Sequence, residues 1–233
     1  MMSESRVRLI IGAVVIFQAA LLLIPQAILG SAIDWPDSLD FAPSKALPLV
    51  ADNLHDVRWG YGIYLIYSFA WVGIGPAIAW LALGANKKIG PLFITAIGLI
   101  CASALARAIG IIRWLTASTY LAETYANSSS QEANTIEIIQ NVVNSWGGAI
   151  GEILGVSLFT VGWLVAVSIL VLKNDGLPRW LGWLGFAIAP ILASPVIELF
   201  GLTANIFLST LSIHIWLFAV GIAIVINETK KVH

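Results

Sequence analysis

Long apolar runs alternate with short polar segments along the whole chain. Six runs reach the ~20 residues that a helix needs to cross a bilayer, and they cover about residues 9–32, 59–83, 90–116, 147–172, 180–200 and 205–227. Because lipid cannot form hydrogen bonds with backbone N–H and C=O groups, each run must be helical. The pattern predicts an all-α integral membrane bundle in which residues 1–233 form a single domain of six transmembrane helices.

Two of the segments between these runs are long enough to have structure of their own. Residues 33–58 contain three prolines, and we expect a short helix at the membrane interface there. Residues 117–146 end in a helical pattern that continues into the fourth run. A helix over Thr135–Leu172 would be about 57 Å long at 1.5 Å per residue, against a hydrocarbon core of ~30 Å. It therefore either projects from the membrane or breaks at Gly147–Gly148.

Lysine and arginine are distributed unevenly between the two sets of loops. In a six-span arrangement, those on one side are Arg6, Arg8, Lys87, Lys88, Lys173, Arg179, Lys230 and Lys231, and only Lys45 and Arg58 flank spans on the other side. By the positive-inside rule, both termini are predicted to be cytoplasmic. The remaining loops, which are rich in Asp and Glu, are predicted to lie on the outer side.

The composition agrees with this class and excludes others. Hydrophobic residues make up 59% of the chain and charged residues 11%, whereas soluble domains carry about 25% charged residues. A net charge of −1 leaves no basic surface for nucleic acid. The single cysteine, Cys101, excludes an internal disulfide. The lipid bilayer is therefore the partner that the composition predicts.

Several motifs of catalytic and cofactor chemistry are absent from the sequence. No lysine lies within a predicted span, which excludes a Schiff base of the retinal type. The sequence has no Gly-rich phosphate loop, no HExxH motif and no Gly-x-Ser-x-Gly elbow. No ionisable residue lies in the predicted cytoplasmic half of the spans, so a proton path across the whole membrane is hard to build. We expect no cofactor and no metal.

Five ionisable side chains fall within the predicted spans, all in the half that faces away from the cytoplasm. They are Arg107, Arg113, Glu152, Glu198 and His214. A charge near the bilayer centre costs at least roughly 2.5–3.5 kcal/mol, so it usually has a partner or a function. Arg107 and Glu152 lie at comparable depth on consecutive spans, and we expect them to pair. The pair is compatible with a structural role and with a binding site.

A stripe of polar and small residues leads along the fourth helix to Glu152. Glu137, Asn141, Asn144, Gly148 and Glu152 follow one another at intervals of three or four, which places them on one helical face. This spacing is typical of a solvated helix and also of a groove that leads into the bundle. Glu152 itself needs a further explanation.

The same helix carries a second pattern, Gly147, Gly151 and Gly155, which we call the glycine face. Small residues at intervals of four allow two helices to approach closely. The partner is either another span of this chain or a second protein, including a second protomer.

Histidine and tryptophan add further candidates. His214, near the middle of the sixth span, is compatible with a packing residue and with a ligand-binding residue. Neither other histidine is placed to be a second haem ligand, and no spacing supports a metal site. Trp71, Trp163 and Trp216 lie deep in the spans and either fill the core or line an apolar pocket. The outer ends of spans carry Trp35, Trp59, Trp114 and Trp146, as in an aromatic belt.

These candidates predict the binding of an amphipathic or lipid-like small molecule in a pocket in the outer half of the membrane. The expected ligand-binding residues are Arg107, Glu152, His214, Asn144 and Trp71. One alternative is an intramembrane isomerase or cyclase, with Glu152 or Glu198 as the general acid. Another is an accessory subunit of a membrane complex that docks through the glycine face. Two carboxyl groups in one dry cavity would favour the enzyme, whereas carboxyl groups paired with arginines would favour structure.

The turn before the fifth span is distinctive, since residues 176–185 read GLPRWLGWLG. This stretch resembles a bacterial membrane family catalogued as domain of unknown function 4386, in which a Leu-Pro-Arg-Trp-Leu-Gly turn typically leads into the fifth of six spans. Residues 151–155 and the arginine-bearing third span are also similar. The resemblance implies a six-span architecture and the inner (plasma) membrane of a bacterium, and it implies no particular activity.

Overall fold

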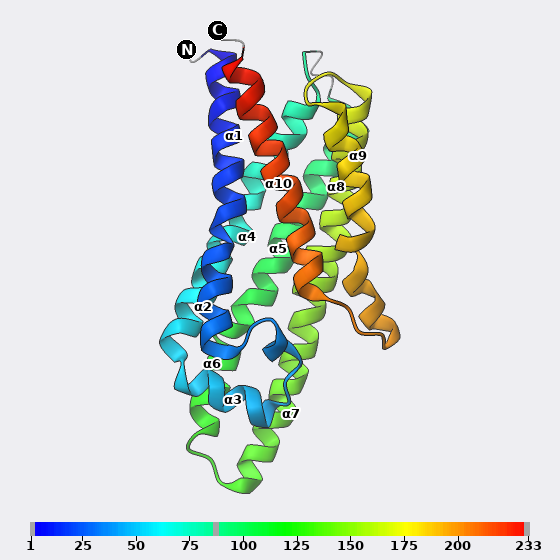
Figure 1. Cartoon of the computed structure of the whole chain (residues 1–233). Coiled ribbons are helices and arrows are strands. Elements are labelled where there is room, and N and C mark those ends of the chain that lie inside the picture. Colours follow the sequence, from blue (N-terminus) through cyan, green and yellow to red (C-terminus); the bar gives the residue numbers. More distant parts are fainter. Residues whose placement is uncertain (1–2, 86–88, 231–233) are drawn as a thin grey trace.

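The computed structural model of the chain describes residues 3–85 and 89–230, and the regular secondary structure of these residues is entirely helical. Within this part of the chain, six helical segments are long and apolar enough to cross a membrane (Figure 1). They are Glu4–Ile33, Leu54–Ala82, Pro91–Tyr125, Ser130–Lys173, Arg179–Phe200 and Ile206–Thr229. Each overlaps one of the six apolar runs, so the predicted all-α membrane bundle is confirmed.

The first candidate span is made of two helices, α1 (Glu4–Leu21) and α2 (Leu23–Ile33). Pro25 has no N–H to donate to the carbonyl of Leu21, and its ring crowds that carbonyl, so the helix is interrupted between the two. After α2 come a 3₁₀ turn η1 (Asp37–Asp40) and a short helix α3 (Pro43–Asp52). The short helix expected within residues 33–58 is therefore present, and its position at the membrane interface stays a prediction.

The remaining elements follow in order along the chain. They are α4 (Leu54–Ala82), α5 (Pro91–Leu115), α6 (Ala117–Tyr125), α7 (Ser130–Gly148), the π-helix η2 (Ala149–Phe159), α8 (Thr160–Lys173), α9 (Arg179–Leu192), the 3₁₀ helix η3 (Ser194–Phe200) and α10 (Ile206–Thr229).

The helix that contains the fourth span does not break at Gly147–Gly148. It begins after a capping box between Ser129 and Glu132. Its winding becomes π-helical at Ala149 and α-helical again in α8. The whole helical segment, Ser130–Lys173, has 44 residues. The first part of α7 extends with α6 beyond the rest of the bundle (Figure 1). The break at Gly147–Gly148 is therefore wrong, and projection of the helix from the membrane stays a prediction.

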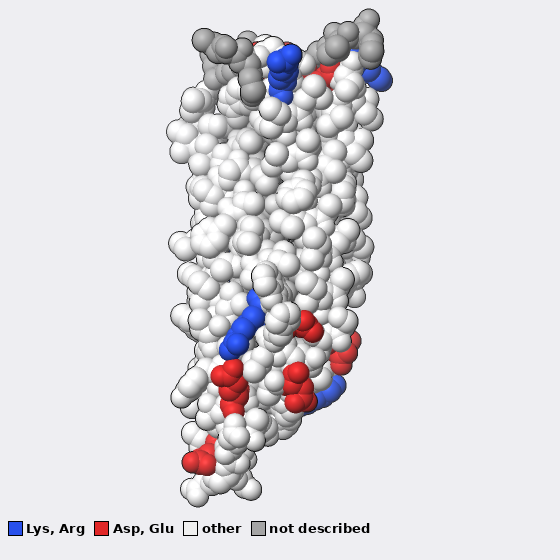
Figure 2. Space-filling model, turned by 90° about the vertical axis from the view of Figure 1, so that its left-hand side faces the viewer, with Lys and Arg blue, Asp and Glu red and all other residues white. Residues whose placement is uncertain are grey.

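The α6–α7 hairpin defines one end of the bundle, which we call the hairpin end, and α1 begins and α10 ends at the opposite end, the termini end (Figure 1). Figure 2 shows one face on which charged side chains gather towards the two ends and a broad band between them is uncharged. Such a band is what a bilayer core requires. The cytoplasmic position of the termini stays a prediction, and Lys87, Lys88 and Lys231, which contributed to it, lie outside the described residues.

The deep tryptophans form part of the core. Trp71 (α4), Trp163 (α8) and Trp216 (α10) are fully buried. Their rings meet edge to face, with centroids 5.2 Å apart for the first pair and 5.5 Å for the second. The Trp216 Nε1 donates a hydrogen bond to the Leu181 carbonyl at 2.9 Å. These contacts join helices that are distant in sequence. Of the two alternatives for these tryptophans, the structure therefore shows that they fill the core.

The glycine face packs against α5 of the same chain. A Cβ atom added to Gly110 would lie 2.6 Å from the Gly151 Cα, and one added to Gly155 would lie 2.9 Å from the Arg107 backbone nitrogen. Real Cβ atoms essentially never approach so closely, so glycine is required at this crossing. The face is therefore covered by another span, and it is not exposed for a second protein.

Candidate functional site

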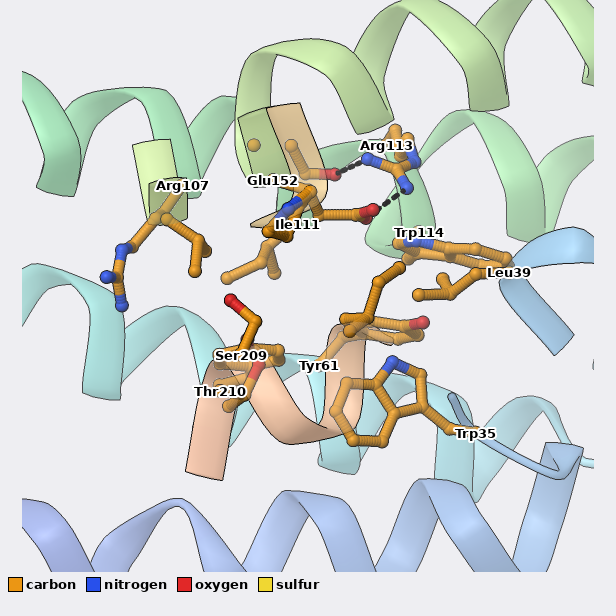
Figure 3. Close-up of a pocket in the computed structure, with 16 residues that line it drawn as sticks. Trp35, Leu39, Tyr61, Arg107, Ile111, Arg113, Trp114, Glu152, Ser209 and Thr210 are labelled. Atoms are coloured by element: carbon orange, nitrogen blue, oxygen red, sulfur yellow. Dashed lines mark hydrogen bonds and ion pairs between the residues drawn. The ribbon is translucent and has the colours of Figure 1, made fainter. Parts of the chain in front are cut away.

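A cavity lies within the half of the bundle nearer the hairpin end, where α4, α5, the π-helix and the beginning of α10 meet (Figure 3). Its aromatic and apolar lining is Trp35, Leu39, Tyr61, Tyr64, Ile111, Trp114, Val156, Pro195 and Ile206, and its remaining lining is Arg107, Gly110, Arg113, Gly151, Glu152, Ser209 and Thr210. The volume is about 40 Å³. At ~10–15 Å³ for each water molecule, this accommodates roughly three waters.

An ion pair forms one wall of the cavity. Arg113 on α5 places Nη2 3.2 Å from Oε1 of Glu152 on the π-helix, and its Nη1 donates to the Gly110 carbonyl at 3.1 Å (Figure 3). The Arg113 side chain is 7% exposed and that of Glu152 is 25% exposed. The Arg113 Nε is buried and has no hydrogen-bond partner among the described residues. The pair is thus held firmly while one polar atom of the guanidinium remains unsatisfied.

The glycine face makes room for this arginine. A Cβ atom on Gly147 would lie 2.5 Å from the Arg113 Cδ, and one on Gly148 would lie 3.5 Å from its Nη2. The guanidinium also lies over the Trp114 ring, 5.5 Å from its centroid. The small residues therefore allow α5 to approach closely and leave room for the Arg113 side chain beside Gly147 and Gly148.

The expected pairing of Arg107 with Glu152 is not the one in the structure. The Arg107 Nε donates to the Ser103 Oγ at 3.1 Å and its Nη2 donates to the Thr160 Oγ1 at 2.8 Å. No acidic residue in the described part of the chain lies within ion-pair distance of it. Its guanidinium points away from Arg113 (Figure 3) and lies 5.2 Å from the centroid of Trp71.

The physical reason is the alignment of the two helices, which run in opposite directions. Gly155 faces Arg107, whereas Gly151 faces Gly110 and Gly147 faces Arg113. Glu152 lies between these levels, so the direction of the side chains decides the pairing. Side chains on a helix tilt towards its N-terminus, so Arg107 reaches towards Ser103, whereas Arg113 reaches towards Gly110 and Glu152 towards Gly148. Arg107 and Arg113 are six residues apart, which is about 9 Å along a helix at 1.5 Å per residue.

Arg107 instead joins α5 to the end of the π-helix. The hydroxyls of Ser103 and Thr160 each accept a hydrogen bond from Arg107 and each donate one to the Gly155 carbonyl at 2.8 Å. The π-helix ends at Phe159, so this network stabilises the junction where α-helical winding resumes. The contacts of Arg107 thus give it a clear structural role, although it also lines the cavity.

The other expected site residues lie outside the lining of the cavity. His214 is buried, and its Nε2 lies 3.2 Å from the Tyr67 hydroxyl while its Nδ1 contacts the Thr210 carbonyl. Trp71 belongs to the core described above. The Asn144 Nδ2 donates to the Leu39 carbonyl at 2.9 Å, which fastens η1 to α7. Glu198 is half-buried on η3. Of the five expected ligand-binding residues, Arg107 and Glu152 line the cavity.

Four aromatic residues of the lining were not among the expected ligand-binding residues. The ring of Tyr61 stacks on that of Trp114, with centroids 5.1 Å apart and planes at 4°, and Trp35 meets the ring of Tyr64 edge to face at 6.4 Å. The Tyr61 hydroxyl is buried without a hydrogen-bond partner in the described structure. Trp35 and Trp114, which the sequence placed in an aromatic belt at the outer ends of spans, are buried. The spacing of Tyr61, Tyr64 and Tyr67 along one helix face was the available signal.

The described residues contain no group of three or more His, Cys, Asp or Glu side chains that could hold a metal ion. Polar groups opposite the ion pair come from α10, where Ser209 and Thr210 reach the cavity (Figure 3). The Ser209 hydroxyl donates to the Leu192 carbonyl at 3.1 Å. The arrangement therefore consists of aromatic walls, one ion pair and a few hydroxyls.

Comparison with known families gives one match. A family model described as a domain of unknown function (DUF4386) matches residues 10–227, a range that includes every residue of the cavity lining. No curated protein and no solved structure matches the chain. The match confirms the resemblance that the turn at residues 176–185 carries.

Proposed function

The chain belongs to the family described as a domain of unknown function (DUF4386), and we propose that it binds an amphipathic, lipid-like small molecule whose polar headgroup enters the cavity. The observation that carries this proposal is a pair of unsatisfied polar atoms on two residues that line the cavity. The Tyr61 hydroxyl and the Arg113 Nε are both buried without a hydrogen-bond partner among the described residues, and both residues line the cavity.

An unsatisfied buried polar group costs about 1–3 kcal/mol. Two such groups beside one cavity are explained if a bound molecule supplies the acceptor and donor atoms that they lack. A headgroup with acceptor oxygens suits the Arg113 Nε, which can only donate, and also the Tyr61 hydroxyl, which can do both. The guanidinium favours an anionic headgroup, while Glu152 already neutralises part of its charge.

The shape of the site supports an amphipathic ligand. Apolar pockets with a few placed polar groups are typical of small-molecule sites. At about 40 Å³ the cavity admits only a small polar group. A second hollow of about 500 Å³, lined by η1 and the segment before α10, shares Ile206 with the lining of the cavity. We infer that the rest of the ligand enters by this route.

Neither alternative function gains support from the geometry. Acid catalysis needs a carboxyl group that faces the substrate, but Glu152 is engaged by Arg113 and Glu198 lies outside the cavity lining. Docking of a partner through the glycine face conflicts with the packing of that face on α5.

Native mass spectrometry of gently solubilised protein tests the proposal. The informative variant is Arg113→Gln/Glu152→Gln, which removes both charges and leaves two amides able to form hydrogen bonds. Its matched control is Arg58→Gln/Glu123→Gln, because Arg58 and Glu123 form an exposed ion pair of 2.9 Å at the same end of the bundle.

We expect the wild type and the control to retain the same bound small molecule and the Arg113/Glu152 variant to lose most of it. Loss of one charge-assisted hydrogen bond, worth about 1.5–3 kcal/mol, predicts an occupancy at least tenfold lower at limiting ligand. Identical bound species at equal occupancy in all three proteins would show that the ion pair has no part in binding.

A further inference from the structure

Two hollows of different character meet at the termini end, far from the cavity described above. One, of about 820 Å³, is lined by Arg8, Lys173, Asn174, Asp175, Gly176, Leu177, Pro178, Arg179, Asn227, Glu228 and Lys230. The other, a groove of about 420 Å³, is lined by Pro178, Trp180, Ala219, Ile222, Ala223, Ile226 and Asn227. They share Pro178 and Asn227. We propose that together they bind one anionic phospholipid, with its phosphate in the first hollow and an acyl chain in the groove.

The charges of the first hollow favour a phosphate. Arg8 is already engaged, because its Nε pairs with the Glu228 Oε1 at 2.7 Å and its Nη2 donates to the Gly176 carbonyl at 2.6 Å. Lys173, Arg179 and Lys230 are exposed, and none of them pairs with a carboxylate in the described part of the chain. Asp175 is the remaining acidic residue of the lining, so three cations face one carboxylate.

The Arg8 contacts also give the hollow a fixed shape. They join the beginning of α1 to the end of α10 and to the turn between α8 and α9. Arg179 donates through Nη2 to the Leu172 carbonyl at 3.2 Å, which orients its guanidinium across that turn. Arg8 and Arg179 are therefore held in place, and Lys173 and Lys230 line the same hollow, as in basic pockets between transmembrane helices that bind anionic headgroups.

The groove provides the argument for a lipid over a free phosphate. It runs between the beginning of α9 and the end of α10, and Trp180, Ile222 and Ile226 expose apolar side chains along it. Trp180 follows Arg179 directly, at the position where a headgroup meets the hydrocarbon. A soluble phosphate would leave the groove unused, whereas an acyl chain that descends from the phosphate fills it.

The test uses protein in nanodiscs of equal parts phosphatidylglycerol and phosphatidylcholine, released for native mass spectrometry with the number of each lipid retained as the readout. Lys173→Gln/Lys230→Gln removes two of the cations, and Ala219→Phe fills the groove. The double variant Lys45→Gln/Arg58→Gln, at the hairpin end, is the control for the loss of two charges. Val72→Phe, which enlarges an exposed apolar side chain outside the groove, is the control for Ala219→Phe.

We expect the wild type and both controls to retain phosphatidylglycerol in preference to phosphatidylcholine. The double lysine variant should bind it more weakly by on the order of fivefold for each charge removed, and Lys173→Arg/Lys230→Arg should restore retention. Ala219→Phe should also lower retention with all charges intact.

Two results would overturn the proposal. In one, both lipids are retained equally by the wild type. In the other, water-soluble glycerol phosphate displaces phosphatidylglycerol at equal concentration and Ala219→Phe has no effect. The site would then bind a phosphate group without an acyl chain.

Discussion

Neutralising Glu152 should destabilise the protein far more than neutralising the exposed ion pair at the same end of the bundle. Glu152→Gln leaves the Arg113 guanidinium, which is 7% exposed, beside a neutral amide in place of the carboxylate, while the Gly110 carbonyl still accepts its other hydrogen bond. Removing one partner of a buried ion pair typically costs about 3–5 kcal/mol, because the other charge stays buried and uncompensated. We expect a loss in this range.

The two single variants should differ, because the two side chains differ in exposure. Arg113→Gln leaves Glu152, whose side chain is 25% exposed and can be partly hydrated, so we expect a smaller loss of about 1.5–3 kcal/mol. The double variant leaves no charge without a partner and should be more stable than Glu152→Gln alone. The resulting coupling energy should fall in the range of about 0.5–3 kcal/mol found for residues in contact.

The assay is reversible unfolding in one detergent with increasing SDS, applied to the wild type, both single variants and the double variant. The same cycle on Arg58 and Glu123, whose side chains are 55% and 47% exposed, should give about 0–1 kcal/mol. A loss below about 1 kcal/mol for Glu152→Gln, or the same coupling energy in both cycles, would refute the assignment of a buried ion pair.

Three further predictions concern neighbouring positions. Arg107→Met should lower the free energy of unfolding by about 1.5–3 kcal/mol and speed amide hydrogen exchange around Thr160, while the protein keeps the ligand of the cavity. Unchanged exchange around Thr160 would contradict the proposal that Arg107 stabilises the end of the π-helix. Gly151→Ala should cost about 1–3 kcal/mol by overpacking the crossing with α5, whereas Gly62→Ala, where a Cβ would meet nothing within 4 Å, should be neutral or stabilising in the same unfolding assay. Tyr61→Phe should leave the ligand-free protein as stable as the wild type or more stable, because it removes an unsatisfied hydroxyl, and should weaken ligand retention in native mass spectrometry; equal retention would argue against a hydrogen bond from Tyr61.

The six spans could be predicted because the bilayer imposes a single requirement. A chain that satisfies its own backbone hydrogen bonds over about 20 apolar residues must be helical there, and hydrophobicity alone shows where those residues are. The glycine face likewise required a close helix crossing, and the structure supplies α5 as the partner. The capping box of Ser129 and Glu132, which was not among the predictions, begins α7 at Ser130 and not at Thr135.

The pairing within the site could not be predicted, because it depends on how each helix is rotated about its axis. The stripe from Glu137 to Glu152 assumes α-helical spacing throughout, but winding becomes π-helical at Ala149, which changes the direction of every later side chain. Members of the stripe contact other elements, since Glu137 accepts a hydrogen bond from the Tyr125 hydroxyl at 2.8 Å and Asn144 binds η1. Glu152 therefore pairs with Arg113, and the pattern of hydrophobic residues does not indicate which of the two arginines is its partner.

Aromatic residues at span ends were ambiguous for a similar reason. Trp35 and Trp146 both follow or precede an apolar run, yet the first is buried in the cavity wall and the second is exposed. The difference arises because the chain after α2 folds back over the bundle as η1, where Asn144 holds it in place. Only the tertiary structure distinguishes a belt residue from a pocket residue.

The central claim, that the cavity binds the headgroup of an amphipathic molecule, is tested most directly by a high-resolution density map of the protein in nanodiscs made from its native lipids. The account predicts one continuous density that contacts the Tyr61 hydroxyl and the Arg113 guanidinium and extends past Ile206 into the neighbouring hollow. A cavity that contains only separate water molecules, with the Arg113–Glu152 pair unchanged, would contradict it.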